Sequence, residues 1–307
     1  MKDKNGIKII GIDHGYGNMK TANVCFPTGV VASEVEPTFQ ANLLVWEGRY
    51  YNVGVGHKEF AGEKDADQDF YVLTLAAMGE ELALAGLREA AVYLAVGLPL
   101  TWVGQQKGAF QNYLLKNEKV AFTYKGQEYT IRIVRVDVSP QGFAAVVNNL
   151  ADFGGMNLLC DIGNGTMNIM YVNDKKPDPL RCFTEKFGTH QCTLRVKEAL
   201  MKEYHVEPPE ELITQVLRTG TADMDEAYLS TITTAAREYT AEIFRKLREH
   251  GYDPRLMRRY VVGGGGALIR NFGDYDANRV TINDDICATA KGYERMLEMK
   301  LRRGDRQ

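Results

Sequence analysis

The sequence predicts an α/β protein built from two similar lobes. Apolar runs of strand length alternate with longer segments of helical periodicity along the 307 residues. A short apolar strand, an aspartate, a glycine-containing turn and an outgoing strand occur at Asp13 and again at Asp161, about 150 residues apart. A duplicated unit of this kind predicts two lobes with a ligand between them. A chain of this length can bury the cores that two lobes require.

The composition argues against several classes of protein. Hydrophobic residues make up 45% and charged residues 25%, as in an ordinary globular protein, and the net charge is −3. We therefore expect no surface that coats nucleic acid or a membrane. No apolar run is long enough for a membrane span, and a polar start leads directly into a strand, so we expect no signal peptide. The five scattered cysteines contain no C-x-x-C pair and predict a cytoplasmic protein with reduced thiols.

The first half is expected to begin with a β-hairpin formed by residues 8–13 and 19–26. Its other strands are expected at 43–46, 50–55, 91–96, 120–124 and 129–134. Its helices are expected at 70–86, 102–116 and 141–150. Pro140 suits the first turn of the last of these helices. The apolar spacing thus predicts a complete α/β lobe, with boundaries 1–150.

The same pattern then restarts in the second half. Strands are expected at 156–161, 167–172 and 259–262, and helices at 189–204, 209–218, 223–249 and 284–301. No long flexible linker separates the halves, so we expect a helix to connect them. The predicted second lobe spans 151–283, and the segment 284–307 forms a C-terminal helix that returns to the first lobe.

The first candidate site is the segment 11–20. Gly15 and Gly17 let the hairpin backbone turn and approach a ligand, so that successive N–H groups can surround a phosphate. Asp13 at the end of the strand can hold a hydrated Mg²⁺ ion, which prefers one or two carboxylates plus waters. Lys20 on the outgoing strand can reach phosphate oxygens. Taken alone, the pattern equally describes a tight hairpin with an exposed aspartate.

Two further segments strengthen the nucleotide hypothesis. Asp161 and the turn 163–166 repeat the first design, and two such hairpins at equivalent places predict a clamp on the β- and γ-phosphates. After the strand 259–262, the four glycines 263–266 leave no side chains, so a base or ribose can lie on the backbone. The alternative for these glycines is a flexible loop between a strand and a helix.

The order of these motifs resembles the superfamily of actin, sugar kinases and heat-shock-chaperone ATPases. IDHGYGNMK (12–20) is similar to the phosphate-1 segment of actin-type proteins, DIGNGT (161–166) to phosphate-2, and VVGGGGALI (261–269) to the adenosine motif. The segments 136–147 and 288–293 stand where the two connecting helices of this superfamily belong. The resemblance covers essentially the whole chain. Within the superfamily, GLPLT at 97–101 resembles the ParM plasmid-segregation actins.

The resemblance implies a two-lobed actin-like, ribonuclease H-like fold with a mixed five-stranded sheet in each lobe and ATP or GTP in the cleft. It makes Asp13 and Asp161 the residues that hold Mg²⁺. Gln141 takes the place of the residue that orients the attacking water, and because glutamine is not a general base, hydrolysis is expected to be slow. Nucleotide contacts are implied for Gly15, Tyr16, Gly17, Asn18, Lys20, Gly163, Asn164, Gly165, Thr166, Gly263, Gly264, Gly265 and Gly266.

The function implied by the resemblance is that of a Mg²⁺-dependent nucleoside triphosphatase that polymerises with itself into filaments. Its expected role is plasmid or other DNA segregation, with DNA bound only through an adaptor protein and no membrane partner. The apolar segment 26–40 is predicted to contribute to the filament contact. A small-molecule kinase and a non-polymerising ATPase of the same fold are the alternatives. A kinase would need a substrate base and inserted segments, for which 307 residues leave little room.

Overall fold

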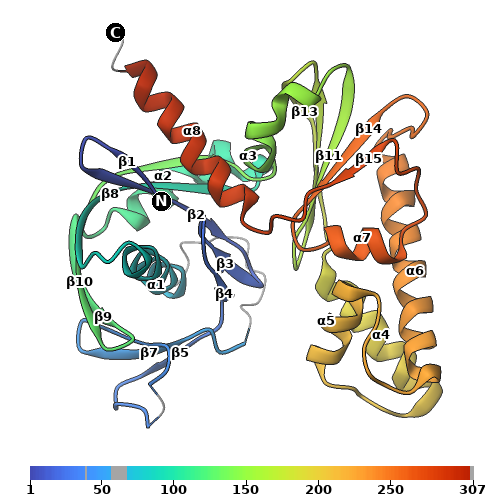
Figure 1. Ribbon diagram of the computed structural model, residues 1–307, viewed down its shortest axis with the longest axis horizontal. Coiled ribbons are helices and arrows are strands. Elements are labelled where there is room, and N and C mark those ends of the chain that lie inside the picture. Colours follow the sequence, from blue (N-terminus) through green and yellow to red (C-terminus); the bar gives the residue numbers. More distant parts are fainter. Residues whose placement is uncertain (39, 57–67, 305–307) are drawn as a thin grey trace. The chain divides into compact units, whose positions relative to one another are not determined.

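The computed structural model describes residues 1–38, 40–56 and 68–304. The chain forms two compact units. Unit 1 contains Met1–Asn148 and Cys287–Gln307, and unit 2 contains Asn149–Ile286. Both units combine helices with a mixed sheet, which confirms the predicted α/β class (Figure 1). Within the described ranges, no helix has the length and apolar character needed to cross a membrane.

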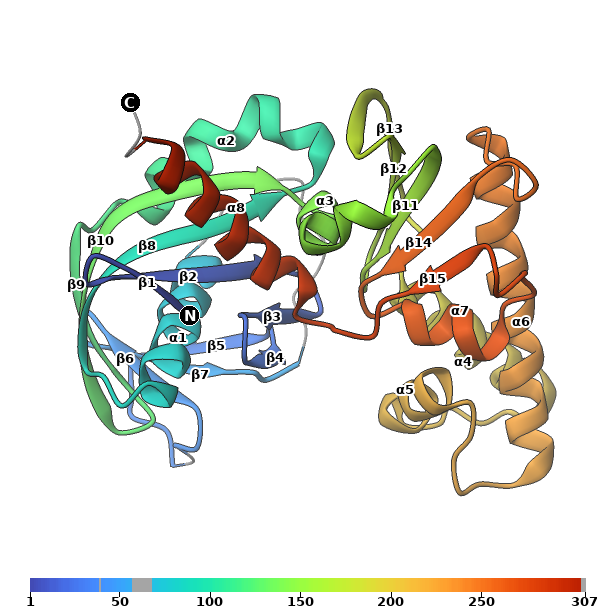
Figure 2. The ribbon, with the colours of Figure 1, turned by 45° about the horizontal axis from the view of Figure 1, so that its top comes forward.

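A strongly curved sheet forms most of unit 1 (Figures 1 and 2). Its described part has ten strands, twice the predicted five, in the order β4-β3-β2-β8-β10-β9-β6-β7-β5, with β1 paired to β2. The difference arises because short antiparallel strands extend both ends of the parallel centre β2-β8-β10. The strands are β1 (Lys2–Lys4), β2 (Ile7–His14), β3 (Asn18–Lys20), β4 (Cys25–Pro27), β5 (Val30–Ser33), β6 (Leu43–Trp46), β7 (Arg49–Val53), β8 (Glu89–Leu98), β9 (Lys119–Tyr124) and β10 (Gln127–Pro140).

The first hairpin has a shorter outgoing strand than predicted. After β3, the backbone N–H of Thr21 donates to Val24 O at 2.8 Å, and the Val24 N–H donates to Thr21 Oγ1 at 2.9 Å. This turn folds β4 back on β3. The prediction of a single strand at 19–26 is therefore wrong. Threonine is common in strands, but here the Thr21 hydroxyl accepts a hydrogen bond that stabilises a turn.

Helix α1 (Asp69–Leu84) lies inside the curve of the sheet of unit 1 (Figure 1). Every residue from 70 to 79 is buried, so the helix has no solvent-exposed face in this stretch. A helix that is apolar on all sides is stable only when it is surrounded by other elements, and here the curved sheet surrounds it. α1 and the inner face of the sheet form the main core of unit 1.

The helix predicted at 141–150 is replaced by a different structure. β10 continues through Pro140, which pairs with Leu98 of β8, and the N–H of Gln141 donates to Leu98 O at 2.8 Å. Gly142 then adopts a φ of +78°, a left-handed value that breaks any helix running through it. Only α3 (Phe143–Val146) and a short 3₁₀ helix (Val147–Asp152) follow. Pro140 thus marks a strand end, where its missing N–H costs nothing, and not a helix start.

Two further helices complete unit 1, α2 (Leu100–Leu114) and α8 (Ala288–Gly304). α8 packs on β2, β8 and α3 (Figure 2). The approach is very close at two glycines: a Cβ at Gly292 would lie 1.8 Å from Ala144 O, and a Cβ at Gly11 would lie 2.0 Å from Ala290 O. The first contact sets α8 against α3, and the second sets it against β2, the strand that carries Asp13.

Unit 2 contains a five-stranded sheet in the order β13-β12-β11-β14-β15, as predicted in number. β11 is antiparallel to β12 and parallel to β14, and β14 is parallel to β15. The elements are β11 (Met156–Ile162), β12 (Met167–Asn173), β13 (Lys176–Glu185), β14 (Arg258–Val262), β15 (Val280–Ile282), α4 (Thr189–Tyr204), α5 (Glu210–Thr219), α6 (Glu226–Glu249) and α7 (Gly266–Phe272).

Three elements of unit 2 escape the sequence patterns. β13 begins with Lys176-Pro177-Asp178-Pro179 and contains no fully buried residue, so it lacks the apolar signature of a strand. Its edge position explains this, because an edge strand can carry prolines and polar residues. β15 has three residues and α7 has seven, which is too short for a periodic pattern.

Candidate functional site

Three predicted site residues meet at the end of β2 in unit 1. The Asp13 side chain is almost buried, with 8% of the residue exposed. Gln141 Nε2 donates to Asp13 Oδ1 at 3.1 Å, and Lys20 Nζ lies 3.6 Å from Asp13 Oδ2. Lys20 reaches the carboxylate because β3 pairs it directly opposite Asp13, which places both side chains on one face of the hairpin. Both carboxylate oxygens of Asp13 thus have a polar neighbour from unit 1.

The turn after Asp13 is too tight for side chains at its start. The Gly15 N–H donates to Asp13 O at 3.1 Å, and a Cβ at Gly15 would lie 2.6 Å from Asn18 O. Thr28 holds the other side of the turn, because its hydroxyl donates to Tyr16 O at 2.6 Å and its N–H to Gly17 O at 3.2 Å. The C=O and N–H of a trans peptide point in opposite directions, so the N–H groups of Gly17 and Asn18 point away from Thr28.

The two bulky residues of this turn, His14 and Tyr16, pack their side chains toward α1, His14 fully buried and Tyr16 half-buried. His14 is fully buried, its Nε2 lies 2.8 Å from Thr74 Oγ1, and its ring packs edge-on against Phe110. Tyr16 packs edge-on against Phe70 at a centroid distance of 5.9 Å. Alternation along the strand explains His14, because consecutive side chains point to opposite faces and Asp13 points to the other one. The Tyr16 backbone therefore forms part of the turn, while its ring packs against α1.

The second aspartate–glycine turn connects β11 and β12 in unit 2. Asp161 is the penultimate residue of β11, and the Gly163 N–H donates to Thr166 O at 2.8 Å to close the turn. Helix α4 begins directly behind the turn: the N–H of Thr189 donates to Gly163 O at 3.0 Å and that of His190 to Asn164 O at 2.9 Å. The sequence motifs do not include Thr189 or His190, which lie about 25 residues further along the chain.

The four-glycine segment lies on the end of β11, next to Asp161. Gly263 has a φ of +85°, and a Cβ there would lie 2.7 Å from Asp161 Oδ1. A Cβ at Gly265 would lie 2.2 Å from the Ile162 side chain, and the Gly265 N–H donates to Ile162 O at 2.9 Å. Gly264 faces open space, and Gly266 begins α7. The parallel pairing of β11 with β14 therefore brings two predicted segments of unit 2 together, about 100 residues apart in sequence.

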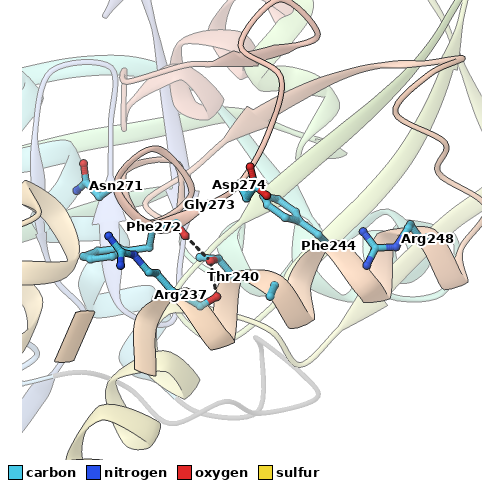
Figure 3. A pocket seen from close by; sticks show the side chains of 9 residues that line it. Arg237, Thr240, Phe244, Arg248, Asn271, Phe272, Gly273 and Asp274 are labelled. Carbon is cyan, nitrogen blue, oxygen red and sulfur yellow. Dashed lines mark hydrogen bonds between the residues drawn. The ribbon is translucent and has the colours of Figure 1, made fainter. Parts of the chain in front are cut away.

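A separate hollow of about 490 Å³ lies on unit 2 along α6 and the end of α7 (Figure 3). The Thr240 hydroxyl joins the two helices by donating to Phe272 O at 2.9 Å. The arginines Arg237 and Arg248 and the carboxylate of Asp274 give the hollow mixed charge. None of the predicted site residues lines it. The lining residues are Arg237, Thr240, Ala241, Phe244, Arg248, Asn271, Phe272, Gly273 and Asp274.

Known proteins share this architecture. Residues 11–143 match the family model of the N-terminal domain of actin-like proteins. A search of curated protein sequences gives no match. An archaeal actin homologue, Ta0583, superposes with a TM-score of 0.76 at 18% identity, over 95% of this chain and 100% of that chain.

Two ParM proteins are also similar in structure. The psk41 ParM protein gives a TM-score of 0.72 at 17% identity, covering 99% of this chain and 100% of that chain. ParM of Bacillus thuringiensis, solved with ATP, gives 0.70 at 14% identity, covering 97% and 100%. The chain thus has the actin-like fold, and the match to the family of actin-like N-terminal domains covers its residues 11–143.

Proposed function

We propose that the chain binds a Mg²⁺-bound nucleoside triphosphate, ATP or GTP, and hydrolyses it. The observation that carries the proposal is that each unit places an aspartate at a strand end beside a backbone turn that side chains would obstruct. In unit 1 the obstruction is at Gly15, and in unit 2 it is at Gly263 and Gly265, next to Asp161. Glycine turns of this kind let the backbone approach a ligand closely, a phosphate at Gly15 and a base or ribose at the four-glycine segment. The archaeal homologue solved with ADP and the ParM solved with ATP have the same fold.

The residues present suit a magnesium ion. Mg²⁺ keeps several waters and in nucleotide sites uses one or two carboxylates besides phosphate oxygens. Asp13 and Asp161 would supply these carboxylates, and Lys20 and Gln141 hold the Asp13 carboxylate in one orientation. The bound ion would neutralise charge that develops on the β- and γ-phosphates.

Gln141 and Lys20 have separate roles in the proposed reaction. The Gln141 amide is already oriented by its bond from Nε2 to Asp13 Oδ1, and its Oε1 is the acceptor that would orient a water for attack on the γ-phosphate. An amide cannot remove a proton from that water, so turnover should be slow. Lys20 adds a positive charge beside the turn and would contact a phosphate oxygen.

The proposal extends to self-assembly into nucleotide-dependent filaments. Alp12, whose structure was solved as a filament, gives a TM-score of 0.69 at 15% identity over 97% of this chain. In the segment 26–40, of which residue 39 lies outside the described residues, Val31 is 51% and Val35 75% exposed. β5, which contains Val31, is an edge strand in the described part of the sheet. Exposed apolar side chains at a sheet edge suit a head-to-tail contact that repeats without closing.

In this proposal the filaments segregate plasmid or other DNA, which an adaptor protein links to them. The formal net charge of −3 agrees with indirect attachment, because a protein that binds DNA directly presents a basic surface. An adaptor would recognise the filament, so the chain itself needs no groove for a double helix.

Light scattering and sedimentation test the filament proposal. With Mg-ATP or Mg-GTP, scattering should rise above a critical protein concentration and fall as phosphate is released. A double variant, Val31→Ser with Val35→Ser, should raise the critical concentration and leave nucleotide binding unchanged. Two results together would instead establish a kinase. The protein would stay dispersed with a non-hydrolysable triphosphate bound, and one small substrate would stimulate turnover of the hydrolysable nucleotide.

A further inference from the structure

Three hydrogen bonds join the second aspartate–glycine turn, residues 163–166, to the start of α4. Two come from backbone N–H groups, Thr189 to Gly163 O at 3.0 Å and His190 to Asn164 O at 2.9 Å. The third is between side chains: Thr189 Oγ1 donates to Asn164 Oδ1 at 3.2 Å. The carbonyl groups of Gly163 and Asn164 and the Asn164 side chain therefore all point toward the start of α4.

This attachment determines where the other side of the turn points. The carbonyl of Gly163 shares a peptide with the N–H of Asn164, and the carbonyl of Asn164 shares one with the N–H of Gly165. Because C=O and N–H oppose each other in a trans peptide, these two N–H groups point away from α4. The two peptides also continue the dipole of the 16-residue helix, whose N-terminus carries partial positive charge. The turn thus presents two aligned donors to an anion.

Gly188 makes the attachment possible. A Cβ at Gly188 would lie 2.0 Å from Asn164 O, inside the space that the turn occupies. The position of Gly188 is itself fixed, because the buried Tyr239 donates its hydroxyl hydrogen to Gly188 O at 2.7 Å and Gln191 Oε1 accepts from the Gly188 N–H at 2.8 Å. α6, which carries Tyr239, therefore supports the turn through α4.

We infer that Thr189 is a positioning residue for the phosphate chain of the nucleotide: through Asn164 it holds the N–H groups of Asn164 and Gly165 toward the β- and γ-phosphates. The inference rests on the proposed nucleotide function and adds a specific residue to it. Thr189 itself does not touch the ligand in this assignment. Its substitution should therefore weaken recognition of the phosphate chain and leave contacts with the nucleoside unchanged.

The test measures dissociation constants of the nucleoside tri-, di- and monophosphate of the preferred base. Thr189→Val keeps the branched shape and the backbone N–H but removes the hydroxyl, and Thr189→Ser keeps the hydroxyl as the matched control. Loss of one hydrogen bond that orients the turn should weaken triphosphate binding about three- to tenfold in Thr189→Val. Thr189→Ser should bind like the wild type. The monophosphate, which lacks the β- and γ-phosphates, should bind equally to all three proteins.

A double-mutant cycle separates positioning from general damage. Asn164→Ala removes the other partner of the side-chain bond, so adding Thr189→Val to it should cause little further loss. Losses that add, or an equal loss for the monophosphate, would overturn the inference even though the wild type binds triphosphate. A wild type that binds no triphosphate would overturn the proposed function, and the inference with it. Equal melting temperatures of the variants show that each is folded.

Discussion

Replacing Gly292 by alanine should destabilise unit 1, although alanine is the better helix former. Gly292 lies in α8 where this helix meets α3. A Cβ there would lie 1.8 Å from Ala144 O, 2.4 Å from Ala144 C and 3.0 Å from Ala144 Cα. All three atoms are backbone, so no side-chain rotation can relieve the contact. α8 or α3 must move as a body.

The size of the effect follows from two opposing terms. Ordinary contact begins at 3.4 Å, so the helices must separate by about 1.6 Å, the difference between 3.4 and 1.8 Å. Overpacking of this kind costs about 1–3 kcal/mol, and more where the backbone must shift. Alanine in place of glycine returns about 1 kcal/mol of helix propensity. The contacted atoms are backbone, so the cost should lie at the upper end of this range, about 2–3 kcal/mol or more. After the gain in helix propensity, we expect a net loss of about 1–2 kcal/mol or more in the free energy of unfolding.

Gly104 provides the matched control within the same unit. It lies inside α2, and a Cβ there meets nothing within 4 Å, so Gly104→Ala should raise the free energy of unfolding by up to about 1 kcal/mol. Urea unfolding followed by circular dichroism measures both variants. We predict that the two substitutions change the free energy of unfolding in opposite directions. Equal stability of Gly292→Ala and the wild type would refute the close packing of α8 on α3.

Three further predictions concern the candidate site and one ion pair of unit 1. Asp161→Ala and Asp13→Ala should each fold but lose Mg²⁺-dependent phosphate release, and normal turnover in both would remove them from the site. Gln141→Ala should keep nucleotide affinity and slow single-turnover hydrolysis about tenfold or more; lost binding with unchanged hydrolysis per bound nucleotide would make Gln141 structural. The ammonium of Lys2, 2.6 Å away, and the nearby Arg295 lower the pKa of Glu298 from 4.5 to about 2. Because this pKa is lower in the folded state, the stabilisation is present above pH 4.5 and disappears as the pH falls toward 2. Glu298→Gln should reduce the slope of stability against pH in that window, and an unchanged slope in urea titrations would contradict the contact.

Short-range patterns in the sequence determined several features of this protein. The strands that end near Asp13 and Asp161, the glycine turns after them and the long helix at 189–204 follow from local alternation, turn residues and helical spacing. These signals act over a few residues, so they are visible in one sequence. They are sufficient for the α/β class and for the choice of Asp13, Lys20, Asp161 and the glycine turns as candidates, whereas Gln141 was chosen from its place in the family's order of motifs.

Contacts between distant residues were decided only by the tertiary structure. That Gln141 donates to Asp13 depends on the parallel pairing of β8 with both β2 and β10, which brings together residues 128 positions apart. The same pairing extends β10 through Pro140, against its local helix signal. The hydrogen bond from Thr189 to Asn164 joins residues 25 positions apart, and it depends on the packing of α4 against the turn that contains Asn164. No local pattern records such pairs, because their free energy comes from burial and hydrogen bonds formed only after the chain has folded.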